Sequence, residues 1–302
     1  MSKLKGKKPE ENIQPGHFKG LFFGKPGAGK TWLALNFPNP FYVDTEGGAR
    51  LSHYMKKLSD AGGVYFGPEE GSNDFEMLLD QIKALSTEEH SYKTLIIDSI
   101  TKIFNSAIGD EQEKLGEKDQ YGKSKKAPIA KMRRLVNLID KIDLNVIFIA
   151  HETVEWKNGE SVGYKPDCWD KLPYELDLAV RIEHEKQGIR VGTITKSRLL
   201  GFPEFSRFDV QNGKNDVGYQ EFSSRYGRDF IEAAPKPVVL CSPDQVAQIT
   251  HLVSVLKMED GELEKILNRA GAEEIAELRT EQAEKFIAQL KKKIDGPNKG
   301  EK

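Results

Sequence analysis

Residues 21–35 read Leu-Phe-Phe-Gly-Lys-Pro-Gly-Ala-Gly-Lys-Thr-Trp-Leu-Ala-Leu, and this stretch decides the fold. Positions 24–31 form a complete Gly-x-x-x-x-Gly-Lys-Thr phosphate loop between an apolar strand-like run and a helix-like run. In such a loop, backbone N–H groups turn towards phosphates, the lysine reaches the β- and γ-oxygens, and the threonine hydroxyl ligates Mg²⁺. The loop therefore predicts a nucleoside triphosphate site, with ATP and Mg²⁺ as the expected ligands. The predicted nucleotide-binding residues are Gly24, Lys25, Pro26, Gly27, Ala28, Gly29, Lys30, Thr31 and Trp32.

The composition is typical of a globular chain. Its 302 residues are 30% charged and 38% hydrophobic, with a net charge of −2, so any contact with nucleic acid must come from local patches. The two cysteines, Cys168 and Cys241, lack partners at metal-ligand spacing, which argues against a disulfide framework or a zinc site. No run approaches the roughly 18 apolar residues of a membrane helix, and residues 1–12 lack the apolar segment of a signal peptide. We expect a protein of the reducing cytoplasm.

Strand-like apolar runs alternate with helical periodicity through the first three quarters of the chain. This alternation predicts an α/β fold, a phosphate-loop core whose mainly parallel sheet is flanked by helices. Apolar residues at helical spacing in 75–85 and 129–142 predict two of the covering helices. The predicted strands are 20–23, 41–44, 64–66, 94–98, 146–150, 176–182 and 190–195.

The composition shifts at the Ala-Ala-Pro-Lys-Pro segment 233–237, after which the pattern is helical. Ser242 followed by Pro243 and Gln245 predicts a capping box at a helix start, a second helix should stop at Gly271, and a third should begin at Thr280. The predicted organisation is a disordered basic tail (1–14), an ATPase core (15–233), a linker (234–242), a small helical module (243–293) and a disordered tail (294–302).

Three predicted strand ends carry candidate catalytic groups that would act with Lys30. Asp98 is expected, as a Walker B carboxylate, to hold Mg²⁺ together with Thr31. Glu46 is favoured as the group that activates the attacking water, although an acid in this place is also typical of a solvated loop. His151 is expected to hydrogen-bond the γ-phosphate, at a position where a lone histidine is more often structural.

Lys196 and Arg198 lie two residues apart near the end of the last predicted strand, so their side chains share one face. Such a pair can stabilise negative charge in a transition state, either in the same chain or in a neighbouring subunit. The alternative is a surface hairpin.

Two segments carry the features of contact with a polyanion. Residues 123–134 contain six basic side chains and no acidic one, and residues 152–171 interleave aromatic with basic side chains, as in proteins that bind single-stranded nucleic acid. Each segment would look the same if it were merely solvated. The candidate DNA-binding residues are Lys123, Lys125, Lys126, Trp156, Lys157, Tyr164, Lys165, Trp169 and Lys171.

The order of these motifs over residues 15–232 resembles the RecA-type recombinase core. The resemblance rests on Asp-Thr-Glu at 44–46, Thr-Leu-Ile-Ile-Asp-Ser at 94–99, Val-Ile-Phe-Ile-Ala-His at 146–151 and Leu-Ala-Val-Arg-Ile at 178–182. It implies a RecA-like fold in which Glu46 activates water and His151 senses the γ-phosphate. It also implies that two disordered loops, at about 109–128 and 153–171, bind single-stranded DNA. Lys196 and Arg198 would reach the γ-phosphate of the next subunit.

More narrowly, the Ala-His-Glu ending at 150–152 and the Thr-Lys-Ser-Arg strand at 195–198 resemble phage-encoded RecA-like ATPases of the Sak single-strand annealing group. His151 stands where bacterial RecA has glutamine, and the N-terminal polymerisation segment is absent or reduced to about 14 residues, which argues against long filaments. The resemblance implies a DNA-stimulated ATPase of phage recombination that binds single-stranded DNA, forms homo-oligomers and promotes annealing or pairing. It also implies that the protein acts in the cytoplasm of a bacterial host.

Two alternatives remain open at this point. One is a hexameric helicase or loader built on the same core. The other is a nucleotide-gated adaptor whose helical tail recruits a partner such as a single-strand DNA-binding protein.

Overall fold

A nine-stranded sheet runs through the core of the computed structural model, within the residues that it describes (16–119, 122–185, 188–212 and 215–295). The strand order is β11-β10-β9-β8-β1-β5-β4-β2-β3, and the strands from β8 to β3 in this order are parallel. The remaining three are added in antiparallel fashion at the β8 edge. These strands are β1 (Lys19–Phe23), β2 (Pro40–Asp44), β3 (Val64–Phe66), β4 (Thr94–Asp98), β5 (Asn145–Ala150), β8 (Leu178–His184), β9 (Arg190–Ser197), β10 (Arg207–Asn212) and β11 (Asn215–Asp216).

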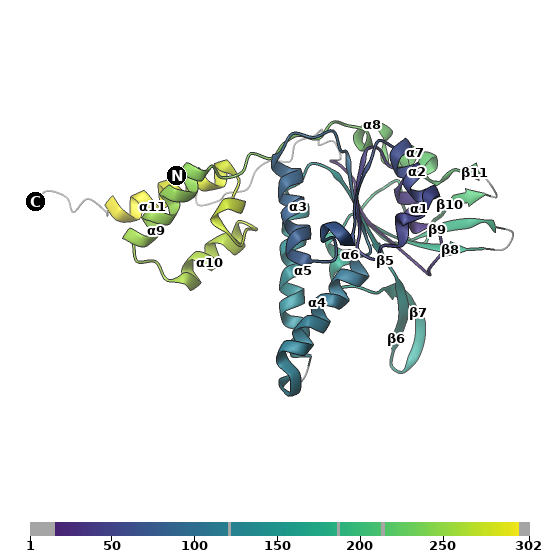
Figure 1. Ribbon diagram of the computed structural model, residues 1–302, viewed down its shortest axis with the longest axis horizontal. Coiled ribbons are helices and arrows are strands. Elements are labelled where there is room, and N and C mark those ends of the chain that lie inside the picture. Colours follow the sequence, from purple (N-terminus) through teal and green to yellow (C-terminus); the bar gives the residue numbers. More distant parts are fainter. Residues whose placement is uncertain (1–15, 120–121, 186–187, 213–214, 296–302) are drawn as a thin grey trace, which may run out of the picture.

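Helices cover both faces of this sheet (Figure 1). In β4, Ile97 packs with the buried residues of α3, α4 and α5, whereas the preceding Ile96 packs with those of α1, α2 and α7 on the other face. Central parallel strands are apolar throughout because both of their faces are covered. The helices of the core are α1 (Lys30–Ala34), α2 (Ser52–Asp60), α3 (Phe75–Thr87), α4 (Ile100–Leu115), α5 (Lys126–Ile139), α6 (Leu172–Glu175), α7 (Gly218–Tyr226) and α8 (Arg228–Ile231).

The predicted α/β fold with a mainly parallel sheet is confirmed, and each of the seven predicted strands is present with ends within two residues of the prediction. In the part of the chain that the structure describes, no helix is both long and apolar enough to cross a membrane.

The two segments predicted as disordered loops are largely regular, so that prediction was wrong. Residues 109–115 continue α4, short 3-10 turns follow at Gly116–Lys118 and Lys123–Lys125, and α5 begins at Lys126; residues 120 and 121 lie outside the described part. The second segment forms an antiparallel hairpin of β6 (Glu152–Lys157) and β7 (Glu160–Pro166), which projects from the core in Figure 1. Its turn residues, Asn158 and Gly159, have positive φ angles of 53° and 84°, as a tight hairpin turn requires.

The C-terminal module consists of α9 (Pro243–Val255), α10 (Asp260–Arg269) and α11 (Thr280–Asp295). The capping box is confirmed, because the Ser242 hydroxyl accepts from the Gln245 backbone N–H while the Gln245 side chain accepts from the Ser242 N–H. Side chains such as Ile249, Leu267 and Phe286 form a core of the module's own. Residues 294 and 295 belong to α11 rather than to a tail. The predicted tails 1–14 and 296–302 lie outside the described residues.

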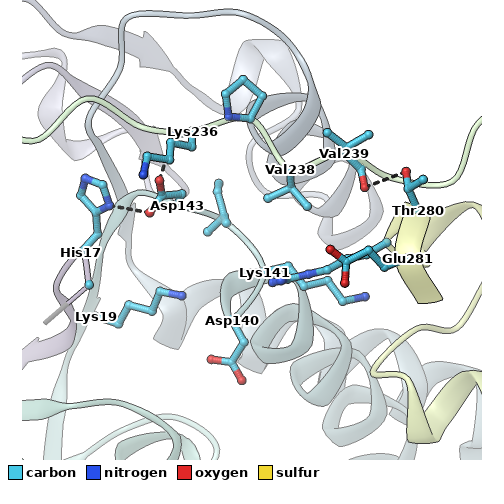
Figure 2. A pocket seen from close by; sticks show the side chains of 14 residues that line it. His17, Lys19, Asp140, Lys141, Asp143, Lys236, Val238, Val239, Thr280 and Glu281 are labelled. Atoms are coloured by element: carbon cyan, nitrogen blue, oxygen red, sulfur yellow. Dashed lines mark hydrogen bonds and ion pairs between the residues drawn. The ribbon is translucent and has the colours of Figure 1, made fainter. Parts of the chain in front are cut away.

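A pocket of about 530 Å³ lies between the core and the module, at the end of β1 opposite the phosphate loop (Figure 2). Asp143 joins the two sides of this junction: its Oδ1 lies 2.8 Å from Nδ1 of His17, and its Oδ2 accepts from the Lys236 backbone N–H at 2.8 Å. The start of β1 and the linker are thereby held together.

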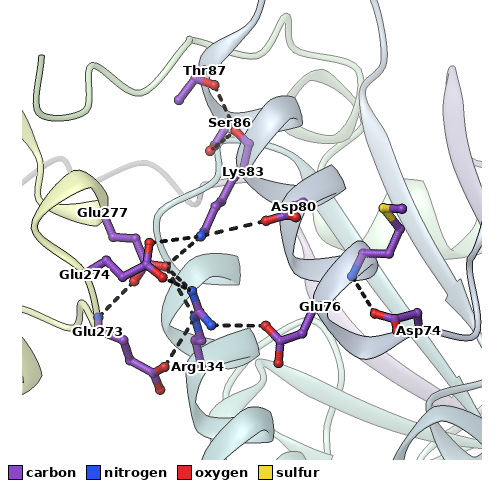
Figure 3. Close-up of polar contacts among 11 residues, drawn as sticks. Asp74, Glu76, Asp80, Lys83, Ser86, Thr87, Arg134, Glu273, Glu274 and Glu277 are labelled. Carbon is purple, nitrogen blue, oxygen red and sulfur yellow. Dashed lines mark hydrogen bonds and ion pairs between the residues drawn. The ribbon is translucent and has the colours of Figure 1, made fainter. Parts of the chain in front are cut away.

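The module is anchored to α3 and α5 through one buried carboxylate, that of Glu277 (Figure 3). Its Oε1 lies 2.9 Å from Nη2 of Arg134 and 3.1 Å from Nζ of Lys83. Burial raises the pKa of Glu277, but hydrogen bonds from the Glu273 backbone and from Arg134 and Lys83 outweigh burial and lower this pKa overall. The contribution of ionised Glu277 to the free energy of unfolding is therefore fully present above the ordinary carboxyl pKa. It is lost as the pH falls through the lowered pKa that Glu277 has in the folded protein.

Replacing Glu277 by alanine is expected to destabilise this docking by about 3 kcal/mol, at the lower end for a broken buried ion pair, because Arg134 keeps other acidic neighbours. Urea unfolding measures the change. Glu274→Ala is the matched control: its side chain is 59% exposed, so we expect a loss below about 1 kcal/mol. Equal losses in the two variants would contradict the anchoring role of Glu277.

Candidate nucleotide-binding site

The phosphate loop leaves the carboxyl end of β1 and leads into α1. Gly27 and Gly29 adopt φ angles of 76° and 101°, in the region that favours glycine. At Gly24 there is no room for a side chain, since a Cβ atom would lie 2.2 Å from the carbonyl oxygen of Ile182 in β8. Gly29 is the residue before α1, so the unpaired N–H groups of the first helical turn lie at the loop.

Lys30 is held inside the loop, with 7% of its surface exposed. Its ammonium donates to the carbonyl oxygens of Gly24 at 3.0 Å and Lys25 at 2.9 Å. Burial lowers the pKa of Lys30, and the nearby Asp98, Glu46 and Glu152 oppose this effect by raising it. A phosphate would add the negative charge that this buried cation favours.

Asp98 ends β4 beside the first turn of α1. Its Oδ2 accepts from Oγ1 of Thr31 at 2.6 Å and from the Tyr42 hydroxyl at 2.9 Å. Burial raises the pKa of Asp98, while these two hydrogen bonds lower it; burial also raises the pKa of Tyr42. Carboxylate and hydroxyl oxygens are suitable ligands for Mg²⁺, which usually takes one or two protein groups together with phosphates and water. The pair Thr31 and Asp98 therefore fits the predicted metal site.

Glu46 lies just past β2, in a turn that Asp44 holds in place. The Asp44 carboxylate accepts the backbone N–H groups of Glu46, Gly47 and Ala49 at 3.0, 2.7 and 2.9 Å, so it serves the backbone rather than a ligand. The turn leaves the Glu46 side chain directed at the site, with 36% of it exposed.

The structure brings Glu46 and His151 together. Oε1 of Glu46 lies 3.1 Å from Nε2 of His151 and also accepts a hydrogen bond from the Ser99 hydroxyl. Three residues from three strand ends thus meet around one carboxylate oxygen. Ser99 was not among the predicted site residues, although it directly follows the Walker B aspartate.

The predicted catalytic and metal-binding residues Lys30, Thr31, Glu46, Asp98 and His151 line one pocket of about 190 Å³. Tyr42 and Tyr54 also line it and were missed by the sequence predictions. Tyr42 shares a strand face with Asp44, a period-two signal that places it near the site, whereas no local pattern marks Tyr54. The residues lining this pocket are Pro26, Gly27, Lys30, Thr31, Tyr42, Asp44, Glu46, Gly48, Ala49, Tyr54, Asp98 and His151.

Two residues predicted to bind nucleotide make other contacts. Trp32 lies against α2, where the Lys57 ammonium is 4.2 Å from its ring centroid, and it does not line the pocket. The Lys25 ammonium lies 5.6 Å from the ring centroid of Tyr164 in the hairpin.

Lys196 and Arg198 lie away from this pocket. Lys196 is paired in register with Ala179, near the start of β8, whereas the phosphate loop leaves the opposite end of the adjacent β1. Their side chains donate to the carbonyl oxygens of Leu176 and Tyr174, respectively. This placement does not agree with the prediction that Lys196 and Arg198 stabilise transition-state charge at the nucleotide site of their own chain. The prediction that they act at the site of a neighbouring subunit stays a prediction.

The candidate DNA-binding residues are also divided by the structure. The prediction for Trp169 was wrong, because its side chain is 7% exposed and packs in the core. Ion pairs join Lys165 to Asp170 at 2.6 Å and Lys157 to Glu155 at 3.3 Å. The remaining candidates, all on the surface, are Lys123, Lys125, Lys126, Trp156, Tyr164 and Lys171.

The basic segment 123–134 is not uniformly available to a polyanion. Arg134 is surrounded by carboxylates of α3 and of the C-terminal module, and Lys131 lies 3.1 Å from Glu76. The sequence pattern could not distinguish these two cations from the exposed lysines of the same segment, because their partners lie far along the chain.

A family model described as an AAA domain matches residues 17–209. No curated protein matches the chain.

Proposed function

The chain belongs to this AAA domain family and is an ATP-binding P-loop nucleotide hydrolase, and from this premise we propose that its ATPase cycle controls a grip on single-stranded DNA. In this proposal the protein is a RecA-like ATPase of phage recombination that promotes annealing or pairing. The observation that supports it most directly is that β5 leads straight into the hairpin. His151, which follows β5, lines the proposed ATP pocket, and the next residue, Glu152, begins β6.

The geometry supports hydrolysis at this pocket with distinct roles for its residues. Lys30 binds the β- and γ-phosphates, and Thr31 and Asp98 would hold Mg²⁺, which neutralises phosphate charge when bound. Glu46 orients and deprotonates the attacking water through Oε2, because Ser99 and His151 already engage Oε1. Fixing one carboxylate oxygen in this way sets the direction of the other.

Exposed basic and aromatic side chains support the DNA-binding part. Trp156, on the hairpin, is 65% exposed, as stacking on bases requires, and Tyr164 is 41% exposed beside Arg181 and Lys25. The surface lysines Lys123, Lys125 and Lys126 lie at the junction of α4 and α5, on the side of the core from which the hairpin also projects (Figure 1).

Exposed apolar side chains beside the distant cation pair support a homo-oligomer. Tyr174, Leu200 and Phe205 are 68%, 101% and 81% exposed, and Arg198 is bonded to the backbone of Tyr174. In the proposed assembly this surface packs on a second copy, and Lys196 and Arg198 face the neighbouring nucleotide.

The test is the ATPase rate of the full chain with and without single-stranded DNA, together with filter binding of DNA with and without a non-hydrolysable ATP analogue. We expect stimulation of the rate and tighter binding in the analogue-bound state. An unchanged rate and equal affinities would overturn the DNA-binding proposal. Closed six-fold rings on DNA in electron micrographs, without annealing activity, would favour the motor alternative instead.

A further inference from the structure

Arg181, in β8, joins the beginning of the hairpin to the strand beside the phosphate loop. Its Nε donates to Oε2 of Glu152 at 2.8 Å, and its Nη1 lies 2.8 Å from Oε2 of Glu183. The Glu152 side chain is only 5% exposed and that of Arg181 20% exposed. A carboxylate so deeply buried depends on this charged partner, so the first residue of β6 is tied to β8.

The same guanidinium also contacts the second strand of the hairpin. Its central carbon lies 4.3 Å from the ring centroid of Tyr164 in β7, a cation–π distance. Both strands of the hairpin are thus held by one side chain.

The phosphate loop contacts the same tyrosine. The ammonium of Lys25 lies 5.6 Å from the ring centroid of Tyr164. The backbone carbonyl oxygen of Lys25 accepts a hydrogen bond from the ammonium of Lys30 at 2.9 Å. A phosphate bound by Lys30 competes with the carbonyl oxygens of Gly24 and Lys25 for the three N–H groups of this ammonium, so we expect the position of Lys25 to change with the nucleotide. A pocket of about 220 Å³ separates the loop from Glu152 and Arg181 and leaves space for such a movement.

We propose that Arg181 is a positioning residue that transmits the state of the phosphate loop to the β6–β7 hairpin. The route runs from Lys25 to Tyr164 and through Arg181 to Glu152, and none of these four residues lines the pocket that His151 lines. Arg181 does not line the hydrolysis pocket and has no part in the chemical step. The proposal rests on the proposed function only in taking the hairpin as the DNA-binding element.

Arg181→Met removes the guanidinium and keeps most of the side-chain length. Because this variant leaves Glu152 unpaired, the double variant Arg181→Met with Glu152→Gln is measured beside it and removes both charges. Tyr164→Phe keeps the ring and serves as a conservative variant. Arg207→Met is the matched control, since Arg207 is an exposed arginine of β10 that pairs with Glu185 and contacts neither the loop nor the hairpin.

The experiment measures amide hydrogen exchange of residues 152–166 in the full chain, with and without a non-hydrolysable ATP analogue and Mg²⁺, and the affinity for a fluorescent ATP analogue. We expect nucleotide to slow exchange in the hairpin by about fivefold or more in the wild type, Tyr164→Phe and Arg207→Met. In both Arg181 variants this response should fall below about twofold while nucleotide affinity is kept.

A full hairpin response in the double variant, or no response in the wild type, would overturn the role of Arg181. DNA binding is then measured separately. If the hairpin responds to nucleotide through Arg181 but the affinity for DNA is the same with and without nucleotide, the proposed function is refuted. The role of Arg181 in transmitting the state of the phosphate loop is then retained. DNA affinity that still depends on nucleotide without Arg181 would refute this role alone.

Discussion

Lys30→Ala is expected to abolish tight binding of ATP and to lower kcat by about 10²- to 10³-fold, the effect of removing one preorganised group that stabilises transition-state charge. Lys30 is 7% exposed, and two carbonyl oxygens hold its ammonium within the phosphate loop, so the charge is kept beside the expected phosphate site. Binding of a fluorescent ATP analogue and phosphate release give the two numbers.

The control for Lys30 is Lys56→Ala. Lys56 is an exposed lysine of α2, 2.9 Å from Asp60, and its removal should leave both measurements unchanged. Wild-type turnover in Lys30→Ala would show that the phosphate loop is not the hydrolysis site.

Glu46→Gln is expected to lower kcat by about 10²- to 10⁴-fold, the range for loss of a general base, while the affinity for ATP stays close to wild type. The amide retains the shape of the side chain and can still accept from Ser99, but it cannot take a proton from water. Steady-state kinetics separates the two effects, because a base that acts only on the attacking water changes kcat rather than binding.

Glu69→Gln is the matched control, since Glu69 is a 75% exposed acid paired with Arg50 and should leave the rate unchanged. If Glu46→Gln kept the turnover rate of the wild type, Glu46 would not be catalytic. The nucleotide-gated adaptor would then become the better account of the protein.

The sequence was sufficient for the parallel part of the sheet because each of these strands is apolar over several consecutive residues. It was not sufficient for β10, although Phe208 and Val210 alternate there and are buried. It also missed the hairpin, where Asn158 and Gly159 are a strong turn signal but the flanking strands are mostly polar and partly exposed. Strands that pair without burying apolar side chains leave little trace in a hydrophobic pattern.

The sequence predicted which residues share the pocket where these residues lie at strand ends. It did not predict which basic and aromatic residues are buried or paired with residues far along the chain. Asp98, Glu46 and His151 line one pocket because parallel strands bring their carboxyl ends to the same edge. Trp169 and Arg134 lie in segments whose composition resembles a DNA-binding surface, yet one packs in the core and the other binds Glu277. Burial and pairing of this kind depend on contacts that no local pattern records.

The hairpin contacts Arg181 near its base and has exposed residues at its turn, so a rotation about the base displaces the turn most. Glu152 and Pro166 are paired at the base, whereas Asn158 and Gly159 form the turn. Six residues of strand span about 20 Å at about 3.3 Å per residue, so a tilt of about 10° at the base moves the turn by roughly 3 Å. A small rotation of the hairpin beside the phosphate loop would thus displace the turn by a distance similar to the thickness of one nucleotide base.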